Sequence, residues 1–278
     1  RPREPAMVEI TSLHIYPVKS CRGVSLERAL ITPTGFEHDR QWLIAREDGR
    51  FITQREEPRL ALIETALTPE GLTLRRKDGA ALDVPFARRG REVQVVCWKD
   101  RCAAFDEGEE AARWLSEFIG KPLRLARFDP RGRRPSDPQW TGGVETLNQF
   151  SDGFPWLLIS QASLDDLNSR LDSPLPMNRF RPNIVVSGLA PYGEDSVSEF
   201  VSDGVRLKPV KACARCAIPA TDQDAGVRSG DEPMRTLKQY RYNRMVQGVA
   251  FGQNLIALEG FGRSLHVGQT MRAIHSEA

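Results

Sequence analysis

The sequence lacks several features that would assign a chain to a functional class directly. Its 278 residues carry 39 Lys and Arg against 37 Asp and Glu, a net charge of +2, which excludes the strong positive field of a general nucleic-acid-binding protein. The longest apolar run, at 154–159, has about six residues against the ~20 that span a bilayer, so no membrane span is expected. Residues 1–6 precede the first predicted strand and contain no apolar segment typical of a secretory signal.

Cysteine and histidine are scarce, with five and four copies. An odd number of cysteines in a long chain favours a reducing compartment over a disulfide framework, so a cytoplasmic location is expected. A chain of this length buries about 75% of its unfolded surface and needs no structural metal in order to fold. With 40% hydrophobic and 27% charged residues, the composition is typical of a soluble globular protein.

Short apolar segments separated by turn residues dominate both halves of the chain. This spacing indicates a β-sandwich or β-barrel and gives no strand–helix alternation typical of a doubly wound sheet. The predicted strands are 8–15, 43–46, 51–54, 60–67, 72–76 and 93–98 in the first half, and 156–160, 183–186, 205–210, 255–258 and 265–271 in the second.

Two helices and one long loop complete the expected organisation. A helix is predicted over 109–119, where five apolar residues share one face before Gly120 and Pro122 end it. A second helix is predicted to start at Ser160 or Ser163. The segment 129–143 holds three prolines, three glycines and three arginines, so we expect a domain joint there, between domains 7–128 and 129–275.

The segment with the clearest chemical potential places Cys213 and Cys216 at a C-x-x-C spacing. A thioredoxin-like pair, a zinc site completed by Cys97 and Cys102, and two buried thiols are all compatible with that spacing. A fourth possibility is that one thiolate is the single protein ligand of a metal carried by an organic cofactor, with Arg215 favouring the charged sulfur. Spacing alone leaves these alternatives open.

A metal-carrying cofactor with an anionic tail would also need cations and hydrogen-bond donors. Four motifs offer them: Lys19-Ser20, His38-Asp-Arg40, Thr53-Gln-Arg55 and Arg179-Phe-Arg-Pro-Asn183. A single Lys or Arg is most often a solvated surface charge, so these motifs do not decide between the alternatives by themselves.

Six motifs in a fixed order resemble a known family. They are Tyr16-Pro-Val-Lys-Ser20, Asp39-Arg40, Glu57-Pro-Arg-Leu60, Phe180-Arg-Pro-Asn-Ile184, Cys213-Ala-Arg-Cys216 and Phe251-Gly-Gln-Asn254. Over residues 8–271 the chain resembles MOSC proteins, the molybdenum cofactor sulfurase C-terminal-like domains. It is similar to the group that joins a MOSC N-terminal β-barrel domain to a MOSC domain, which includes the mitochondrial amidoxime-reducing component and the bacterial YcbX proteins.

The resemblance implies a fold that is mainly β with a few helices, in which a MOSC N-terminal β-barrel domain packs on a MOSC β-barrel domain. It implies a molybdenum-cofactor-dependent oxidoreductase, independent of pyridoxal phosphate, that reduces N-hydroxylated compounds such as amidoximes and N-hydroxylated bases. The alternative is a carrier of the molybdenum cofactor or of sulfur, in which Cys216 holds the cofactor or bears a persulfide. A zinc-stabilised interaction domain is a third hypothesis.

The resemblance also implies roles for individual residues. Cys216 corresponds to the molybdenum ligand, and Asp152 to an acidic residue near the metal that would deliver a proton or orient a water. The residues expected to hold the pyranopterin and its phosphate are Lys19, Ser20, Arg40, Arg181 and Asn183. Weaker candidates are Arg55, Arg59 and Arg179, and Cys213 is expected to pack.

The sequence departs from some members of that group. After Val267-Gly-Gln269 it contains no C-x4-C-x2-C run for an iron–sulfur cluster, so electrons are expected from a separate flavin, haem or iron–sulfur protein. The membrane-targeting segment of the mitochondrial members is not found in it, which favours a soluble protein of the bacterial type. The expected partners are therefore a small substrate and an electron donor, with neither nucleic acid nor membrane span.

Overall fold

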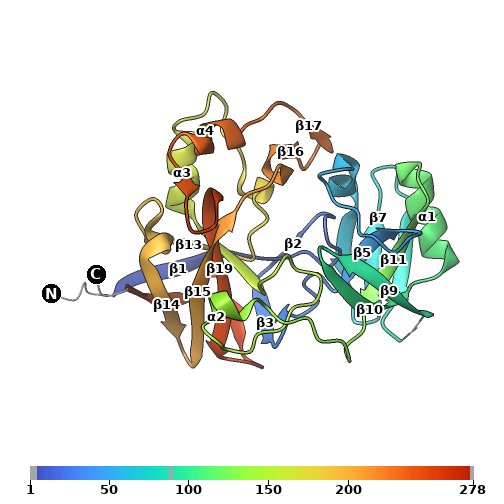
Figure 1. Ribbon diagram of the computed structural model, residues 1–278, viewed down its shortest axis with the longest axis horizontal. Helices are drawn as coiled ribbons and strands as arrows, with labels where there is room; N and C mark the ends of the chain where they lie inside the picture. Colours follow the sequence, from blue (N-terminus) through green and yellow to red (C-terminus); the bar gives the residue numbers. More distant parts are fainter. Residues whose placement is uncertain (1–4, 88–89, 276–278) are drawn as a thin grey trace.

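The computed structural model describes residues 5–87 and 90–275 and contains two lobes (Figure 1). The larger, the barrel lobe, is built from strands of residues 6–36 and 156–275, and the small lobe from residues 42–128. Most of residues 1–6, the segment expected to precede the fold, lie outside the described part, although Ala6 already belongs to the first strand.

Seven strands of the barrel lobe form a closed ring, because the first and last strands of the series also pair with each other. In ring order these are β12 (Trp156–Ser160), β13 (Ile184–Ser187), β1 (Ala6–Ile15), β21 (Thr270–His275), β14 (Val197–Ser202), β15 (Val205–Ala214) and β19 (Gly248–Glu259). The short strands β2 (Val24–Leu26) and β18 (Tyr242–Asn243) extend the sheet, and β3 (Arg28–Thr32), β4 (Gly35–Phe36) and β20 (Ser264–His266) pack beside it. Closure leaves no exposed edge along the ring.

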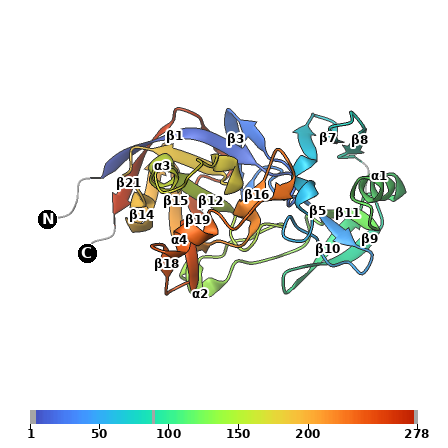
Figure 2. The same ribbon diagram turned by 90° about the horizontal axis from the view of Figure 1, so that it is seen from above.

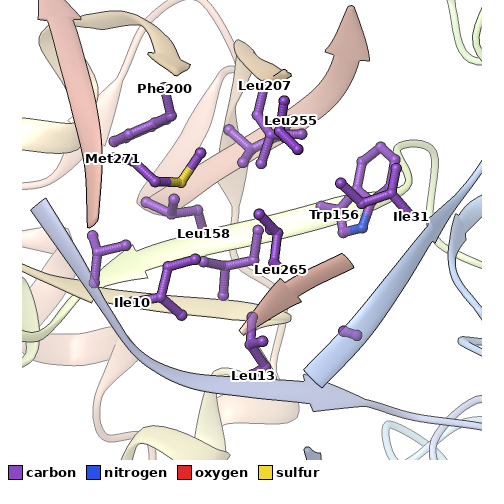
Figure 3. Close-up of a cluster of buried hydrophobic side chains, with 14 of the residues drawn as sticks. Ile10, Leu13, Ile31, Trp156, Leu158, Phe200, Leu207, Leu255, Leu265 and Met271 are labelled. Carbon is purple, nitrogen blue, oxygen red and sulfur yellow. The ribbon is translucent and has the colours of Figure 1, made fainter. Parts of the chain in front are cut away.

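The barrel interior follows from alternation along its strands. In β1 the residues Val8, Ile10, Leu13 and Ile15 are buried. Ile10 and Leu13 are three residues apart, which a regular strand would place on opposite faces, and a register shift between Ile10 and Ser12 turns both inward. Figure 3 shows Ile10 and Leu13 packed with other side chains of this core, among them Trp156.

The small lobe combines two sheets and one helix. The sheets are β5 (Trp42–Arg46), β11 (Leu123–Phe128), β10 (Asp100–Asp106) and β9 (Glu92–Cys97), and separately β6 (Glu64–Leu67), β7 (Gly71–Arg75) and β8 (Ala81–Pro85). Helix α1 (Glu109–Ile119) has the predicted bounds and buries Ala111, Leu115 and Ile119 in the core of this lobe. It ends at Gly120, whose φ of 77° is the left-handed conformation that glycine adopts without penalty.

Short elements connect the strands. They are η1 (Pro58–Leu62), α2 (Pro138–Thr141), α3 (Gln161–Asn168), η2 (Met177–Arg179), η3 (Gly193–Ser196), η4 (Ile218–Ala220), β16 (Thr221–Asp222), β17 (Val227–Arg228) and α4 (Met234–Lys238). Ser160 is the N-cap of α3, and its hydroxyl accepts a hydrogen bond from the Ser163 amide, as one of the two predicted helix starts requires. None of the helices in the described residues is long and apolar enough to cross a membrane.

The mainly β class with a few helices is confirmed, while several strand assignments differ from the structure. The predicted strand 60–67 is instead η1 followed by β6, because Pro58 sets the φ of a helical first turn. The predicted strand 265–271 is two strands separated by a turn at Gly268, with φ of 83°. Residues 51–54 contribute only a bridge, between Phe51 and Ala45.

The first and last described strands, β1 and β21, belong to the same lobe. Strand β1 pairs with both β13 and β21, so the residues that the sequence assigned to the first domain, 7–128, include strands of the barrel. Strands β1 and β21, the first and last of the described residues, pair at one end of the molecule (Figure 2). The core of the barrel lobe therefore combines residues from both sides of the expected boundary at 128 and 129, which coincides with the end of β11.

Candidate functional site

A cavity of about 970 Å³ lies between the two lobes and is lined by residues of both. All the residues to which the sequence assigned a catalytic, metal-binding or cofactor-binding role line it: Lys19, Ser20, Arg40, Asp152, Arg181, Asn183 and Cys216. Eight Lys or Arg residues and three Asp residues contribute to the wall, so the cavity suits an anionic ligand.

Of the three weaker candidates for cofactor binding, one lines the cavity and two do not. Arg55 lines the cavity, whereas Arg59 and Arg179 are not part of its wall. Arg59 pairs with Glu57 and donates a 2.7 Å hydrogen bond to the Ile119 carbonyl at the end of α1. Arg179 pairs with Asp222 at 3.0 Å. These two arginines therefore have structural partners of their own.

Lys19 enters the cavity from the segment that crosses between the lobes after β1. Its amide donates to the Trp42 carbonyl of β5 at 2.8 Å, which fixes the backbone against the small lobe. Its ammonium group is buried, donates to the Phe150 carbonyl at 2.7 Å and pairs with Asp152 Oδ1 at 2.5 Å. A buried ammonium group is thus partly neutralised inside the cavity.

Asp152 is held as an anion. Burial within the cavity would raise its pKa, but the charge and hydrogen bond of Lys19, a 3.0 Å hydrogen bond from Trp98 Nε1 and the charge of Arg40 together hold the pKa well below its usual range. The side chain nevertheless keeps 72% of its surface accessible from the cavity. Asp152 is therefore suited to accept a hydrogen bond from a bound molecule rather than to store a proton at neutral pH.

Arg40 and Arg181 are far apart in the sequence, but both stack on the aromatic ring of Tyr16. Their guanidinium carbons lie 4.3 and 4.2 Å from the ring centroid. The Tyr16 hydroxyl donates to the Pro182 carbonyl at 2.9 Å, and burial raises the pKa of Tyr16 to about 12. Arg40 also pairs with Asp39 at 2.6 Å, so one tyrosine organises two cations at the cavity.

Arg181 lacks an acceptor. It is buried, and within 5–87 and 90–275 its guanidinium has no hydrogen bond or ion pair, only the contact with Tyr16. Burial, reinforced by the charge of Arg40, lowers the pKa of Arg181 to about 10. A buried cation without a counter-ion is costly, so this position fits an anionic group that the protein itself does not supply.

Asn183 connects these cations to the barrel. Its side-chain oxygen accepts hydrogen bonds from Arg40 Nη1 and from the Leu157 amide, both at 3.1 Å, while its amide group donates to the His14 carbonyl. With its own hydrogen bonds made to the framework, Asn183 fixes Arg40 relative to β12 and β1.

Strained backbone gathers at the cavity wall, which the sequence did not reveal. Ser20, Arg40, Trp98 and Arg181 line the cavity with φ of 72°, 48°, 58° and 56°, a left-handed conformation that side chains other than glycine rarely adopt. Such strain persists where surrounding structure imposes it, commonly at functional sites. Because none of these residues is glycine, no sequence signal marked the positions.

Cys216 follows the end of β15 and contributes an exposed thiol to the cavity wall. The Ile218 amide, in η4, approaches its sulfur at 3.5 Å and provides a donor for a thiolate. Arg215, which the sequence expectation directed to Cys216, instead donates to Cys213 Sγ at 3.2 Å and to the Phe180 carbonyl at 2.8 Å. The hydrogen bond of Arg215 is therefore made to the other sulfur of the pair, and its expected effect on the charge of Cys216 stays a prediction.

The structure also bears on the two alternative functions of the cysteine pair, a zinc site and a thioredoxin-like redox pair. No group of three or more potential metal ligands occurs in the described residues, and Cys97 and Cys102 lie in the core of the small lobe, where burial raises the pKa of Cys102 to about 11. Cys213 is on a strand and Cys216 precedes a 3-10 turn, so neither begins an α-helix as a thioredoxin-like pair requires. The described residues therefore provide neither a set of zinc ligands nor the helix N-terminus that activates a thioredoxin-like thiol.

The segment after Cys216 is attached to the small lobe, another feature that the sequence did not indicate. The buried amides of Gln54 and Gln223 exchange two hydrogen bonds, at 3.1 and 2.7 Å. Arg22 donates to the Gln223 carbonyl at 2.9 Å, and Arg228 donates to the Gln54 carbonyl at 3.2 Å. Through these contacts Gln54 of the small lobe, together with Arg22, fixes the chain that carries the exposed thiol.

A basic cavity between a β-barrel and a smaller lobe, with one exposed thiol and a buried unpaired guanidinium, is suited to a large anionic ligand. Comparison with known proteins gives the family. Residues 7–122 match the MOSC N-terminal beta barrel domain and residues 145–272 match the MOSC domain. The chain therefore belongs to the family of MOSC proteins with a MOSC N-terminal domain, and the resemblance of its six motifs is confirmed.

Among its relatives are mitochondrial amidoxime-reducing components. Component 1 of Mus musculus is 39% identical over 241 residues, covering 84% of this chain and 71% of the relative. Component 1 of Homo sapiens is also 39% identical over 241 residues, with 84% and 72% covered. Component 2 of Homo sapiens is 35% identical over 244 residues, again with 84% and 72% covered.

Proposed function

We propose that this protein is a molybdenum-cofactor-dependent oxidoreductase that reduces N-hydroxylated compounds, such as amidoximes and N-hydroxylated bases. The observation that carries the proposal is that the exposed Cys216 thiol and the unpaired Arg181 guanidinium share one basic cavity. The names of the relatives, amidoxime-reducing components, support the class of substrate.

The cavity fits such a cofactor in size and in chemistry. Its volume is at the upper end of the ~300–1,000 Å³ typical of cofactor and ligand sites. Cys216 would supply the soft sulfur ligand to molybdenum. Lys19, Arg40 and Arg181 would neutralise the phosphate, and Ser20 and Asn183 would complete the polar wall around the pterin.

When bound, the cofactor supplies the two-electron chemistry that amino-acid side chains do not provide. The overall reduction breaks one N–O bond: an amidoxime, two electrons and two protons yield an amidine and water. Asp152 is ionised and exposed to the cavity, so its role is to orient the substrate's N–H group or a water by accepting a hydrogen bond. Of the two roles expected from the sequence, proton delivery and orientation, we therefore propose orientation for Asp152.

The two electrons must come from a donor, and we propose a separate protein carrying flavin, haem or an iron–sulfur cluster. A cytoplasmic location is proposed because the five cysteines are free thiols, as a reducing compartment keeps them.

Metal analysis combined with turnover tests the proposal. Protein from a host that makes the cofactor should contain one molybdenum per chain and reduce benzamidoxime with an artificial electron donor. Bound pterin without turnover would support the cofactor carrier instead, and stoichiometric zinc without pterin would support an interaction domain. Absence of both molybdenum and pterin would contradict the proposal.

A further inference from the structure

An exposed tryptophan at the cavity wall has no part in the roles described so far except its bond to Asp152. Trp98 lies in the two-residue turn between β9 and β10, in the small lobe (Figure 1), and is 44% exposed. It occupies the first central position of the turn with φ of 58°. A tight hairpin turn with a positive φ at this position normally carries glycine, so the fold alone would not select tryptophan there.

Three contacts from other segments hold the Trp98 indole in place. Its Nε1 donates to Asp152 Oδ1 at 3.0 Å. The Arg55 guanidinium carbon lies 4.4 Å from the ring, and the Phe51 ring centroid lies 5.4 Å away. The indole is therefore fixed before any ligand arrives, although nearly half of its surface remains available.

The same contacts leave one oxygen of Asp152 available. Lys19 Nζ and Trp98 Nε1 both donate to Oδ1. In the described part of the chain Oδ2 has no hydrogen-bond donor, and the carboxylate is accessible from the cavity. A ligand that carries an N–H donor next to a flat ring can thus bond to Oδ2 while its ring lies against the indole.

We propose that Trp98 is the specificity-determining residue of the substrate site and selects N-hydroxylated substrates whose reacting group is attached to an aromatic ring. This inference rests on the proposed function and names its substrate class. An aryl amidoxime presents an NH2 group for Asp152 Oδ2 and a conjugated ring for offset or edge contact with the indole. An alkyl amidoxime presents the same NH2 group but no ring.

Competition between two substrates measures this selection directly. The quantity is the ratio of kcat/KM for benzamidoxime to kcat/KM for acetamidoxime, measured with molybdenum-loaded protein and an artificial electron donor. Trp98→Gly removes the ring while providing the residue that the backbone conformation favours, so the fold is preserved. Since ring stacking contributes about 0.5–1.5 kcal/mol, this ratio should fall about two- to twelvefold.

Two further variants separate the ring from its other functions. Trp98→Phe keeps an aromatic surface but loses the hydrogen bond to Asp152, and it should retain most of the ratio. Phe261→Gly removes an aromatic residue that is 52% exposed but lies outside the cavity wall, and it should leave the ratio unchanged. Calorimetric binding of benzamidoxime to the oxidised protein should weaken in Trp98→Gly by a similar factor.

The outcomes distinguish this inference from the proposed function. If the wild-type protein turns over both amidoximes and Trp98→Gly keeps their ratio and the benzamidoxime affinity, the assignment of Trp98 is wrong and the proposed function stands. If the molybdenum-loaded wild-type protein neither binds nor reduces either amidoxime, both are wrong.

Discussion

The unpaired charge of Arg181 leads to opposite effects of one substitution on the empty and the loaded protein. The pKa of Arg181 is lowered by burial from 12.5 to about 10. One pKa unit corresponds to about 1.4 kcal/mol, so the charged guanidinium costs the empty protein on the order of 3 kcal/mol. Both pKa values lie above neutrality, so the whole cost is present at pH 7 and fades only above about pH 10.

Arg181→Met removes this charge and keeps a long side chain against Tyr16. The loss of the guanidinium–ring contact costs about 1–2 kcal/mol, so the free energy of unfolding of the empty protein should rise by a net ~1–2 kcal/mol. Urea denaturation of cofactor-free protein at pH 7, followed by tryptophan fluorescence, measures this change. In protein from a cofactor-producing host, the same substitution should lower the molybdenum content, because the anion loses a partner.

Arg101→Met provides a matched control. Arg101 is exposed in β10 and outside the cavity wall, so its loss should change the free energy of unfolding by less than about 0.5 kcal/mol and leave the molybdenum content intact. The reasoning would be refuted if empty Arg181→Met protein were less stable than wild type by more than about 1 kcal/mol. Full molybdenum content in that variant would refute the anion site.

Three further predictions concern other parts of the site. Cys216→Ser should abolish turnover with the fold intact, whereas Cys213→Ser should be tolerated; equal turnover in the two variants would remove Cys216 as the ligand. Asp152→Asn should lower the free energy of unfolding of the empty protein by an amount that is constant above about pH 4 and shrinks below it, because a carboxyl group with a lowered pKa contributes stability that is lost as pH falls. Urea titrations between pH 2 and 7 measure this difference, and a difference that grows in acid would contradict the prediction. Gln54→Leu leaves the buried amide of Gln223 without its partner and should lower the free energy of unfolding by about 1–3 kcal/mol in the same titration at pH 7. An unchanged free energy of unfolding would show that this contact between the lobes does not stabilise the fold.

Local patterns in the sequence determined much of the secondary structure. Helix α1 ends where Gly120 permits a left-handed residue, and strand β12 and the Ser160 cap lie where apolar and capping residues place them. These features depend on neighbouring residues, so short segments encode them. Five of the six motifs contain residues that line the cavity, whereas none of residues 57–60 does.

Contacts between distant segments decided the rest. Strand β1 joins the barrel of the second half because its partners are β13 and β21, and no periodicity within β1 specifies a partner. Arg40 and Arg181 are neighbours because the tertiary fold brings both guanidinium groups onto the ring of Tyr16. Hydrophobic alternation specifies which face of a strand is buried, but burial of a charge, the strain at Trp98 and the direction of Arg215 depend on the atoms that the tertiary fold brings around them.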